Sequence, residues 1–351
     1  MSLSLSIPSL HYLFTKKNAS LLRGESNLSF RPKITLLLPM RNESTNVVRK
    51  ISEAFSFDYP EEKLNIIVVD SGSEDGTASL ARELLDDRGQ VISLPRPGKS
   101  FAINSFLDIV DTDFFVMMDA DAICPPDSLI KLIDWFTDPG IGAVCGQQFD
   151  QFSEQDPYRK RFNILRVGES AIDSTPIFEG SICCFRVAAI GEKRINPDIN
   201  ADDSQLAMLV RSSGLRSIMD PTINFSEEKP ISRKRRIRRS QGLSRALLSR
   251  RDLIFGNGRY GAFVFASIFF YVLMPWLLLS SATLLIIGAL IGFEENSDSQ
   301  FSLAIFAVVL LPLFLISSNF ARSFFSGLGV IMESHLRMFF GSNLAVWNPE
   351  R

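Results

Sequence analysis

Histidine is scarce in this sequence, and the cysteines have no metal-ligand spacing. The only two histidines among 351 residues are His11 and His335, which argues against a histidine-based metal centre or catalytic triad. The four cysteines include an adjacent pair and show none of the spacings of a zinc site. We expect all four to be reduced, small buried residues of a domain that faces the cytosol. They are Cys124, Cys145, Cys183 and Cys184.

The chain also lacks the excess of positive charge that a general binder of polyanions needs, because its formal net charge is −2. One segment, Arg233 to Arg251, is nevertheless strongly basic. No aromatic residue interrupts it, so it does not resemble a stacking platform for nucleic acid, and we expect no nucleic-acid partner. Two interpretations stay open: contact with anionic lipid headgroups, or binding of a lipid phosphate or product diphosphate.

Charged residues are absent from two long apolar runs, 260–293 and 301–321. Both runs are long enough to cross a bilayer, and Pro275 in the first indicates a kinked or tilted span. Arginines flank the pair of runs, whereas the short loop between them carries only acidic charges, so the positive-inside rule places the preceding domain and the C-terminus in the cytoplasm. Residues 324–340 are mixed in polarity and indicate an interfacial helix. We therefore predict a basic interfacial segment at 231–260 and a multi-pass membrane region at 261–351, with two buried core helices of a soluble protein as the alternative.

The first 32 residues are rich in serine and leucine and show no cleavable-signal pattern. Their apolar part, residues 3–14, is too short to span a bilayer. It is either an interfacial segment or an unstructured terminus.

Residues 33–230 alternate short apolar runs with amphipathic stretches. This alternation predicts an α/β domain with a mostly parallel sheet, which binds ligands beyond the carboxyl ends of its strands. The predicted strands are 34–38, 66–69, 91–94, 114–118 and 143–147. The predicted helices are 45–55, 77–85, 101–110 and 128–136.

Acidic and basic residues follow several of these predicted strands. Asp119 and Asp121 come directly after the apolar run 114–118, where two carboxylates can meet one Mg²⁺ or Mn²⁺ and the diphosphate that it carries. Asp70 ends an earlier strand, and Lys99 lies in a loop that enters a helix. Taken singly, each of these residues also fits a turn, a helix cap or an ordinary surface position. Together they suit a metal-bound nucleotide diphosphate.

Several ordered motifs resemble glycosyltransferase family 2, the inverting nucleotide-sugar transferases of GT-A fold. The resemblance covers about residues 33–242 and, in outline, the membrane tail. It rests on Pro39-Met40-Arg41-Asn42-Glu43, on Asp70 to Thr77, on Gly98-Lys99 through Asn104, on Asp119-Ala120-Asp121, on Gly142 to Gly146, on Gly180-Ser181 through Arg186, and on Asp202-Asp203.

This resemblance implies a Rossmann-like GT-A catalytic domain and assigns roles to individual residues. The implied donor-binding residues are Pro39, Glu43, Asp70, Lys99 and Asp119. The implied metal ligands are Asp121 and Asp119, and the implied catalytic residues are Asp203, as general base, and Asp202. The implied acceptor-side residues are Gly180, Ser181, Arg236 and Arg238. From the residues alone, Asp202-Asp203 also fits a helix N-cap.

One motif of the processive members of that family is incomplete. They carry Gln-x-x-Arg-Trp after the base, whereas the aligned stretch here is Arg235-Arg236-Ile237-Arg238-Arg239, in which only Arg238 matches. We therefore expect the transfer of one or a few sugars, from a nucleotide-sugar donor with a UDP-sugar favoured, to a lipid or lipid-linked glycan. The alternatives are a processive polysaccharide synthase, a nucleotidyltransferase and a non-catalytic membrane scaffold. The sequence leaves the oligomeric state open.

Overall fold

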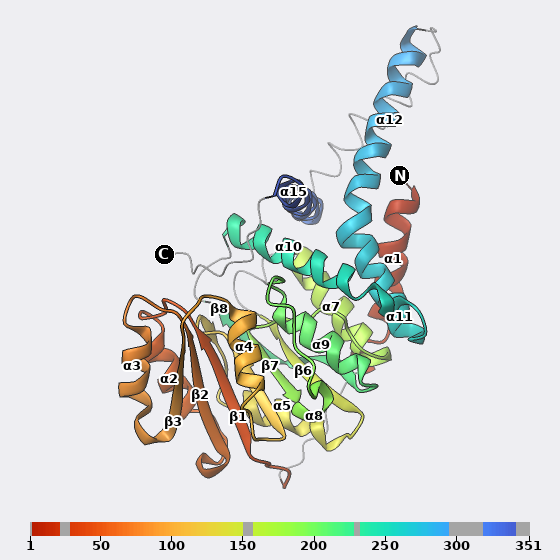
Figure 1. Cartoon of the computed structure of the whole chain (residues 1–351). Helices are drawn as coiled ribbons and strands as arrows, with labels where there is room; N and C mark the ends of the chain where they lie inside the picture. Colours follow the sequence, from red (N-terminus) through yellow and green to blue (C-terminus); the bar gives the residue numbers. More distant parts are fainter. Residues whose placement is uncertain (1, 22–28, 150–156, 228–231, 295–318, 342–351) are drawn as a thin grey trace.

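The structure is a computed structural model that describes all residues except 1, 22–28, 150–156, 228–231, 295–318 and 342–351. Its centre is an eight-stranded sheet in the order β3-β2-β1-β4-β7-β6-β8-β5 (Figure 1). The strands are β1 Ile34–Met40, β2 Leu64–Ser71, β3 Gly89–Leu94, β4 Phe114–Met118, β5 Ala122–Ile123, β6 Ile141–Gln148, β7 Ile182–Arg186 and β8 Arg216–Glu227.

The expected α/β fold is confirmed, and the sheet is parallel where the sequence predicted strands most clearly. Strands β3, β2, β1 and β4 run parallel to one another. Beyond them β7 is antiparallel to both of its neighbours, while β6 and β8 are parallel. The strands β5, β7 and β8 were not predicted. β7 is a five-residue apolar segment with no alternation, which periodicity cannot distinguish from a piece of buried helix.

The central strands are apolar throughout because helices cover both faces of the sheet. In β1, Leu36 and Leu38 join the core on one face, and Leu37 joins the core on the other. The helices that contribute to these two cores are α2 Val47–Phe55, α3 Thr77–Leu85, α4 Lys99–Leu107, α5 Ser128–Asp134, α7 Pro157–Ile172, α8 Val187–Ile190 and α9 Asp202–Ser212. All four cysteines are buried and free, as expected.

The C-terminal part leaves the sheet through a series of helical segments. The basic helix α10 Arg233–Ser249 is capped by Ser232, whose hydroxyl accepts from the Arg235 backbone N–H. It leads to α11 Gly258–Ile268, the π-helical turn η6 Phe269–Leu273 and α12 Met274–Glu294. Pro275 is the second residue after the π-helical turn, and this turn accommodates the missing proline N–H and the proline ring.

One helix in the described part of the chain, Gly258–Gly288, is long and apolar enough to cross a membrane. Its distal part projects away from the α/β domain in Figure 1 and exposes several leucines, among them Leu284 at 68%. The second expected span, 301–321, lies almost wholly outside the described residues. The stretch that we predicted to be an interfacial helix forms a helix, α15 Asn319–Phe339, which exposes Phe325, Leu336 and Phe339 and lies crosswise to α12.

The N-terminal segment forms a helix, α1 Ser2–Lys16, that packs against α7. A side chain at Gly168 of α7 would come within 2.1 Å of the Thr15 carbonyl oxygen, so the two helices touch through their backbones. His11 lies 3.0 Å from Glu169 and stacks on Phe263. The helix still exposes Leu10, Leu13 and Phe14 on its outer side.

Candidate active site

The loops after β1 and β2 are joined to each other at the carboxyl edge of the sheet. Backbone N–H groups of the first loop donate to side chains of the second: Asn42 to Ser73 Oγ at 2.8 Å, Glu43 to Thr77 Oγ1 at 2.8 Å and Ser44 to Asp75 Oδ2 at 3.0 Å. In return the Asn42 side-chain oxygen accepts from the Glu74 backbone N–H. These bonds explain why the segment 70–77 is so polar: its side chains form the edge against which a nucleoside would lie.

Asp70 is buried, and both of its carboxylate oxygens accept hydrogen bonds from Ser73, one from the hydroxyl and one from the backbone N–H. The Asp70 carboxylate therefore stabilises the conformation of the loop that it begins. Pro39 is buried in β1, two residues past the last β1 residue that pairs with β4, so its missing N–H breaks no hydrogen bond to that strand.

Lys99 joins the two acidic motifs. It begins α4, and its ammonium lies 2.7 Å from Asp119 Oδ1 and 3.0 Å from Asp202 Oδ2. Each side chain in this cluster is less than one-fifth exposed. Although burial opposes the charged form, the two carboxylates raise the pKa of Lys99, so its ammonium is permanently charged. The structure thus brings Lys99, Asp119 and Asp202 together, a contact between the two acidic motifs that the sequence analysis did not predict.

Asp121 is held by an arginine that the sequence analysis did not single out. Arg235 Nη1, from α10, lies 2.7 Å from Asp121 Oδ2. Burial alone would raise the pKa of Asp121, but Arg235 outweighs it and holds that pKa below its usual value. Glu43 faces the same cluster, and burial, together with Asp121 and Asp119, raises the pKa of Glu43 to about 7.

The orientation of α10 determines which of its arginines lie near the site. Arg235, Arg238 and Arg239 share one side of the helix at i, i+3 and i+4, and Arg239 Nη2 lies 3.2 Å from Glu227. Arg238 is close enough to Arg235 and Arg239 that these charges, added to burial, lower its pKa. Arg236 is exposed and turned away, so Arg238 but not Arg236 is brought to the site.

Asp203 lies in the first turn of α9 with one oxygen accepting from the Ser204 backbone N–H at 2.7 Å. Burial and the neighbouring Asp202 raise the pKa of Asp203 to about 7. Gly180 lies directly against it: a Cβ at this position would come within 2.9 Å of Asp203 Oδ2. The adjacent Ser181 is buried and accepts from the Asp119 backbone N–H through its carbonyl. The predicted acceptor-side segment therefore touches both carboxylate motifs.

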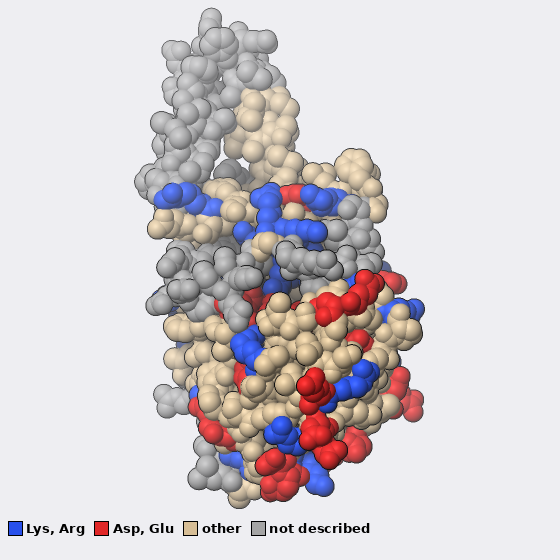
Figure 2. All heavy atoms as spheres, turned by 90° about the vertical axis from the view of Figure 1, so that its left-hand side faces the viewer, with Lys and Arg blue, Asp and Glu red and all other residues tan. Residues whose placement is uncertain are grey.

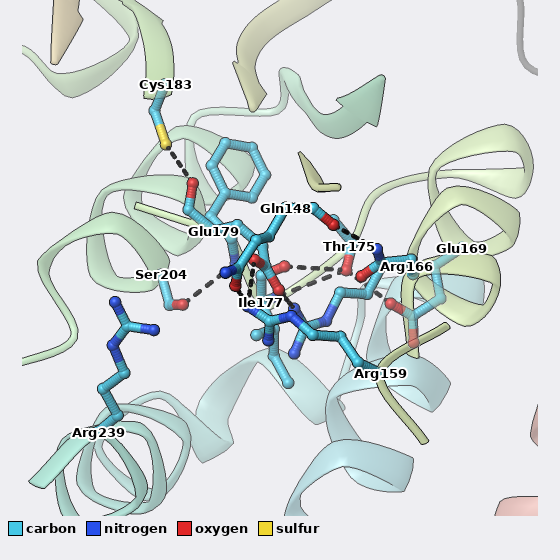
Figure 3. Close-up of polar contacts among 12 residues, drawn as sticks. Gln148, Arg159, Arg166, Glu169, Thr175, Ile177, Glu179, Cys183, Ser204 and Arg239 are labelled. Carbon is cyan, nitrogen blue, oxygen red and sulfur yellow. Dashed lines mark hydrogen bonds and ion pairs between the residues drawn. The ribbon is translucent and has the colours of Figure 1, made fainter. Parts of the chain in front are cut away.

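A buried ionic network supports that segment from α7 (Figure 3). Glu179, next to Gly180, lies 2.6 Å from Arg166 Nη1 and 3.2 Å from Arg159 Nη2. Burial would raise the pKa of Glu179, but Arg159 and Arg166 hold it below its usual value. Arg159 also donates to Gln148 of β6. Sequence patterns could not predict this network, because its members lie on separate elements of the fold.

A second group that the sequence analysis missed holds the loop that carries Asp119 and Asp121. Arg49 of α2 donates to the carbonyls of Ala120 and Ala122, and the fully buried Lys50 donates to the Ala122 carbonyl at 2.6 Å. Glu53 accepts from the Cys124 backbone N–H at 2.7 Å and pairs with both cations. These contacts fix the backbone from which Asp119 and Asp121 project.

The donor set fits a hard divalent cation bound together with a nucleotide. Among the described residues there is no group of three or more histidine, cysteine or acidic side chains placed to hold a metal ion. Asp119 and Asp121 supply carboxylate oxygens, and the remaining ligands would have to come from diphosphate and water, as is usual for Mg²⁺. In the structure, Lys99 is the cationic partner of Asp119, and Arg235 is the cationic partner of Asp121.

Comparison with known proteins agrees with this geometry. Residues 35–194 match the profile of glycosyl transferase family 2. A mannosyltransferase from Pyrobaculum calidifontis, solved with GDP-Man and Mn²⁺, is 25% identical and superposes with a TM-score of 0.83 over 97% of this chain and 96% of that one.

Two curated relatives match over shorter stretches. The beta-monoglucosyldiacylglycerol synthase of a Synechocystis strain is 29% identical over 129 residues, 35% of this chain and 27% of the relative. The poly-beta-1,6-N-acetyl-D-glucosamine synthase of Staphylococcus aureus is 30% identical over 151 residues, 42% of this chain and 36% of the relative. The matches thus span only about a third of these relatives' length.

The fold and the carboxylate motifs at its edge match a GT-A-like fold. Residues 35–194 form a glycosyltransferase family 2 domain, and the solved structure and the curated relatives named above are sugar transferases or synthases of sugar-containing products.

Proposed function

We propose that this protein transfers a sugar, with inversion, from a nucleotide-sugar donor to a membrane-associated lipid or lipid-linked glycan. The observation that carries the proposal is the position of Lys99, which contacts Asp119 on the donor side and Asp202 beside the proposed base. One side chain therefore links the diphosphate position to the position of the attacking hydroxyl.

On the donor side, Asp121 and Asp119 would hold Mg²⁺ or Mn²⁺, which neutralises charge that develops on the leaving diphosphate. Glu43 and the loop around Asp70 line the nucleoside position, with Pro39 below them at the end of β1. Lys99 contributes a permanent positive charge next to Asp119, where it stabilises the diphosphate without any change of protonation.

On the acceptor side, Asp203 takes the proton from the acceptor hydroxyl as its oxygen attacks the anomeric carbon. Its raised pKa, about 7, makes it a better base than an ordinary aspartate, and Asp202 remains paired with Lys99. Gly180 leaves room for an acceptor above this carboxylate, because any side chain there would press on it. Arg238 faces the same space and suits an acceptor phosphate.

The donor nucleoside has two candidates. The sequence favours a UDP-sugar, whereas the full-length structural match was solved with GDP-Man. The first donors to test are therefore UDP-linked and GDP-linked forms of several sugars. A membrane acceptor is supported by the apolar helix Gly258–Gly288 and by the glycolipid product in the name of the Synechocystis relative.

The second candidate function is a processive polysaccharide synthase, favoured by the match to the Staphylococcus aureus enzyme. Against it stands Arg239 at the position where the processive motif has tryptophan, because no aromatic ring is available there to stack on a growing chain. A nucleotidyltransferase or a scaffold would not need a base placed against Gly180.

The test is to incubate membranes that contain the protein with radiolabelled UDP- and GDP-sugars and then to extract the lipids. Label from one donor in the organic phase supports the proposal. Label in a high-molecular-weight polymer alone would favour the processive alternative, and label in neither would contradict both.

The expected orientation has its own test. Basic side chains gather in a band between the α/β domain and the projecting helix (Figure 2), and this supports a cytoplasmic α/β domain by the positive-inside rule. Single cysteines at positions 75 and 297 can be labelled in intact cells with an impermeant reagent. We expect labelling at 297; labelling at 75 instead would invert the topology.

A further inference from the structure

Arg235 forms an ion pair with Asp121, one of the two proposed metal ligands. Its Nη1 lies 2.7 Å from Asp121 Oδ2 and 3.9 Å from Glu227 Oε2. A carboxylate oxygen that accepts from a guanidinium at this distance cannot coordinate a divalent cation with the same lone pair, and the two cations would also repel each other. Metal binding through Asp121 Oδ2 therefore competes with Arg235, and binding through Oδ1 would place the metal next to the same positive charge.

The two cations of the site differ in how readily they can be displaced. Lys99 is 17% exposed and bridges two carboxylates, so removing it would leave both without their partner. The Arg235 pair is the more exposed one, with side chains 25% and 29% accessible, and Arg235 makes its close contact with Asp121 alone. Of the two, Arg235 is thus the exchangeable partner.

The helix that carries Arg235 is held in place by other contacts. Arg239 pairs with Glu227 at 3.2 Å, Arg233 pairs with Glu333 of α15 at 2.6 Å, and Ser240 hydrogen-bonds Ser334 of α15 at 2.9 Å. The backbone of α10 can therefore stay docked while the Arg235 side chain turns. A diphosphate beside Asp121 would offer that guanidinium the bidentate oxygen partner that arginine favours.

We propose that Arg235 is a resident counter-ion that makes the metal and the nucleotide bind together. It excludes a divalent cation from Asp121 as long as the site holds no nucleotide, and it moves to the diphosphate when metal and nucleotide arrive as one unit. This inference rests on the proposed function, because it takes Asp121 as a metal ligand.

The test measures metal binding without turnover. The full-length protein in detergent is titrated with Mn²⁺ alone, and free Mn²⁺ is followed by electron paramagnetic resonance; the titration is repeated with saturating UDP and with GDP. For the wild type we expect weak binding of Mn²⁺ alone and much tighter binding with the nucleotide that the site accepts.

Arg235→Met should raise the affinity for Mn²⁺ alone by about tenfold, the lower end of the effect that one adjacent opposite charge has on proton binding to a carboxylate. It should also reduce the gain in Mn²⁺ affinity that the nucleotide provides. Lys234→Met is the matched control: it removes one positive charge from the exposed side of the same helix and should leave both affinities unchanged. Arg235→Lys keeps the charge and should stay closer to the wild type than Arg235→Met, which shows that a change comes from charge and not from misfolding.

Unchanged or weaker binding of Mn²⁺ alone in Arg235→Met would overturn the counter-ion proposal. The Asp121→Asn variant separates this failure from a failure of the proposed function. If nucleotide fails to tighten Mn²⁺ binding in the wild type, and Asp121→Asn changes nothing, Asp121 is no metal ligand and the metal role itself is wrong. If Asp121→Asn abolishes the coupling while Arg235→Met behaves as wild type, the metal role stands and only the counter-ion role falls.

Discussion

The donor side of the site and its acceptor side are stabilised by different kinds of contact. The loops after β1 and β2 are tied by backbone N–H groups that donate to side chains of the neighbouring loop. Around Gly180 the chain is instead held by ion pairs in which the side chains of Glu179 and Arg166 are at most 10% exposed and that of Arg159 is 25% exposed. Substitutions on the donor side should therefore change ligand binding first, whereas those on the acceptor side should also lower stability.

The largest effect is expected for Asp121→Asn. The amide keeps the shape of the side chain but is a poor ligand for a hard divalent cation. Loss of metal assistance is worth several kcal/mol of transition-state stabilisation, so we expect transfer to fall by about 10⁴-fold. Turnover is measured over a range of Mn²⁺ and Mg²⁺ concentrations, with chelator-treated wild type as the reference. Transfer that continues undiminished in both the variant and the chelated enzyme would remove the metal from the account.

Asp203→Asn should separate chemistry from donor binding. The amide cannot accept the proton of the acceptor hydroxyl, and general bases typically contribute about 10²–10⁴-fold. Donor affinity should change little, because Asp203 lies on the acceptor side of Lys99. Calorimetric donor binding and single-turnover transfer are measured side by side. Loss of donor binding would make Asp203 part of the nucleotide site, and unchanged transfer would point to an acceptor, such as a lipid phosphate, that needs no base.

Glu179→Gln and Asp75→Asn compare the two sides directly. Glu179→Gln leaves buried arginine charge without its carboxylate, which costs about 3 kcal/mol, or roughly 5–10 °C in the midpoint of thermal unfolding. Asp75→Asn changes a more exposed carboxylate that can still accept hydrogen bonds as an amide, so its effect should stay within about 1 kcal/mol. The midpoints of thermal unfolding of both variants are measured in the same detergent and compared with that of the wild type. Equal shifts would show that the two sides are not stabilised differently.

The pH dependence should be the mildest effect. Because burial raises the pKa of Asp203 to about 7, the base is largely protonated at pH 6 and largely ionised at pH 8. The value of kcat/KM should fall about tenfold from pH 8 to pH 6, whereas an ordinary aspartate would give no change in this range.

Stability should change with pH in the opposite direction. Asp203 and Glu43 bind protons more tightly in the folded than in the unfolded protein, so the unfolding free energy decreases as pH rises from about 4 to 7.

For the kinetic prediction, the pH–rate profile of the wild type is compared with that of Asp203→Asn. The residual activity of this variant should no longer fall at acidic pH. An identical fall in that variant would assign the titration to another group.

Local sequence patterns were sufficient for the strands that carry the donor side. An uninterrupted apolar run followed by Asp119 and Asp121 predicted β4 and the position of both carboxylates. The position of Lys99 at the same edge of the sheet could also be predicted, because the carboxyl ends of parallel strands lie together at one edge.

The parts that local patterns missed depend on residues far apart in the chain. Arg235 is separated from Asp121 by 114 positions, and only the docking of α10 decides that Arg235 rather than Arg236 faces the site. Lys50 and the Ala122 carbonyl are 72 positions apart, and a buried lysine in an amphipathic helix has no signature of its own. The three strands that were not predicted are β5, β7 and β8. They pair with one another or with strands far away in the chain, and the periodicity of the sequence contains no information about such pairing.

The most direct test of the central claim is sugar transfer into lipid by the purified wild type and Asp203→Asn in the same lipid nanodiscs. Each is given the radiolabelled donor identified from the panel, at a concentration that saturates both, and the organic extract is counted over time. The account predicts label that accumulates with the wild type and at least about 10²-fold more slowly with the variant, at equal donor occupancy. Equal rates in the two proteins, or label that never enters the organic phase, would contradict it.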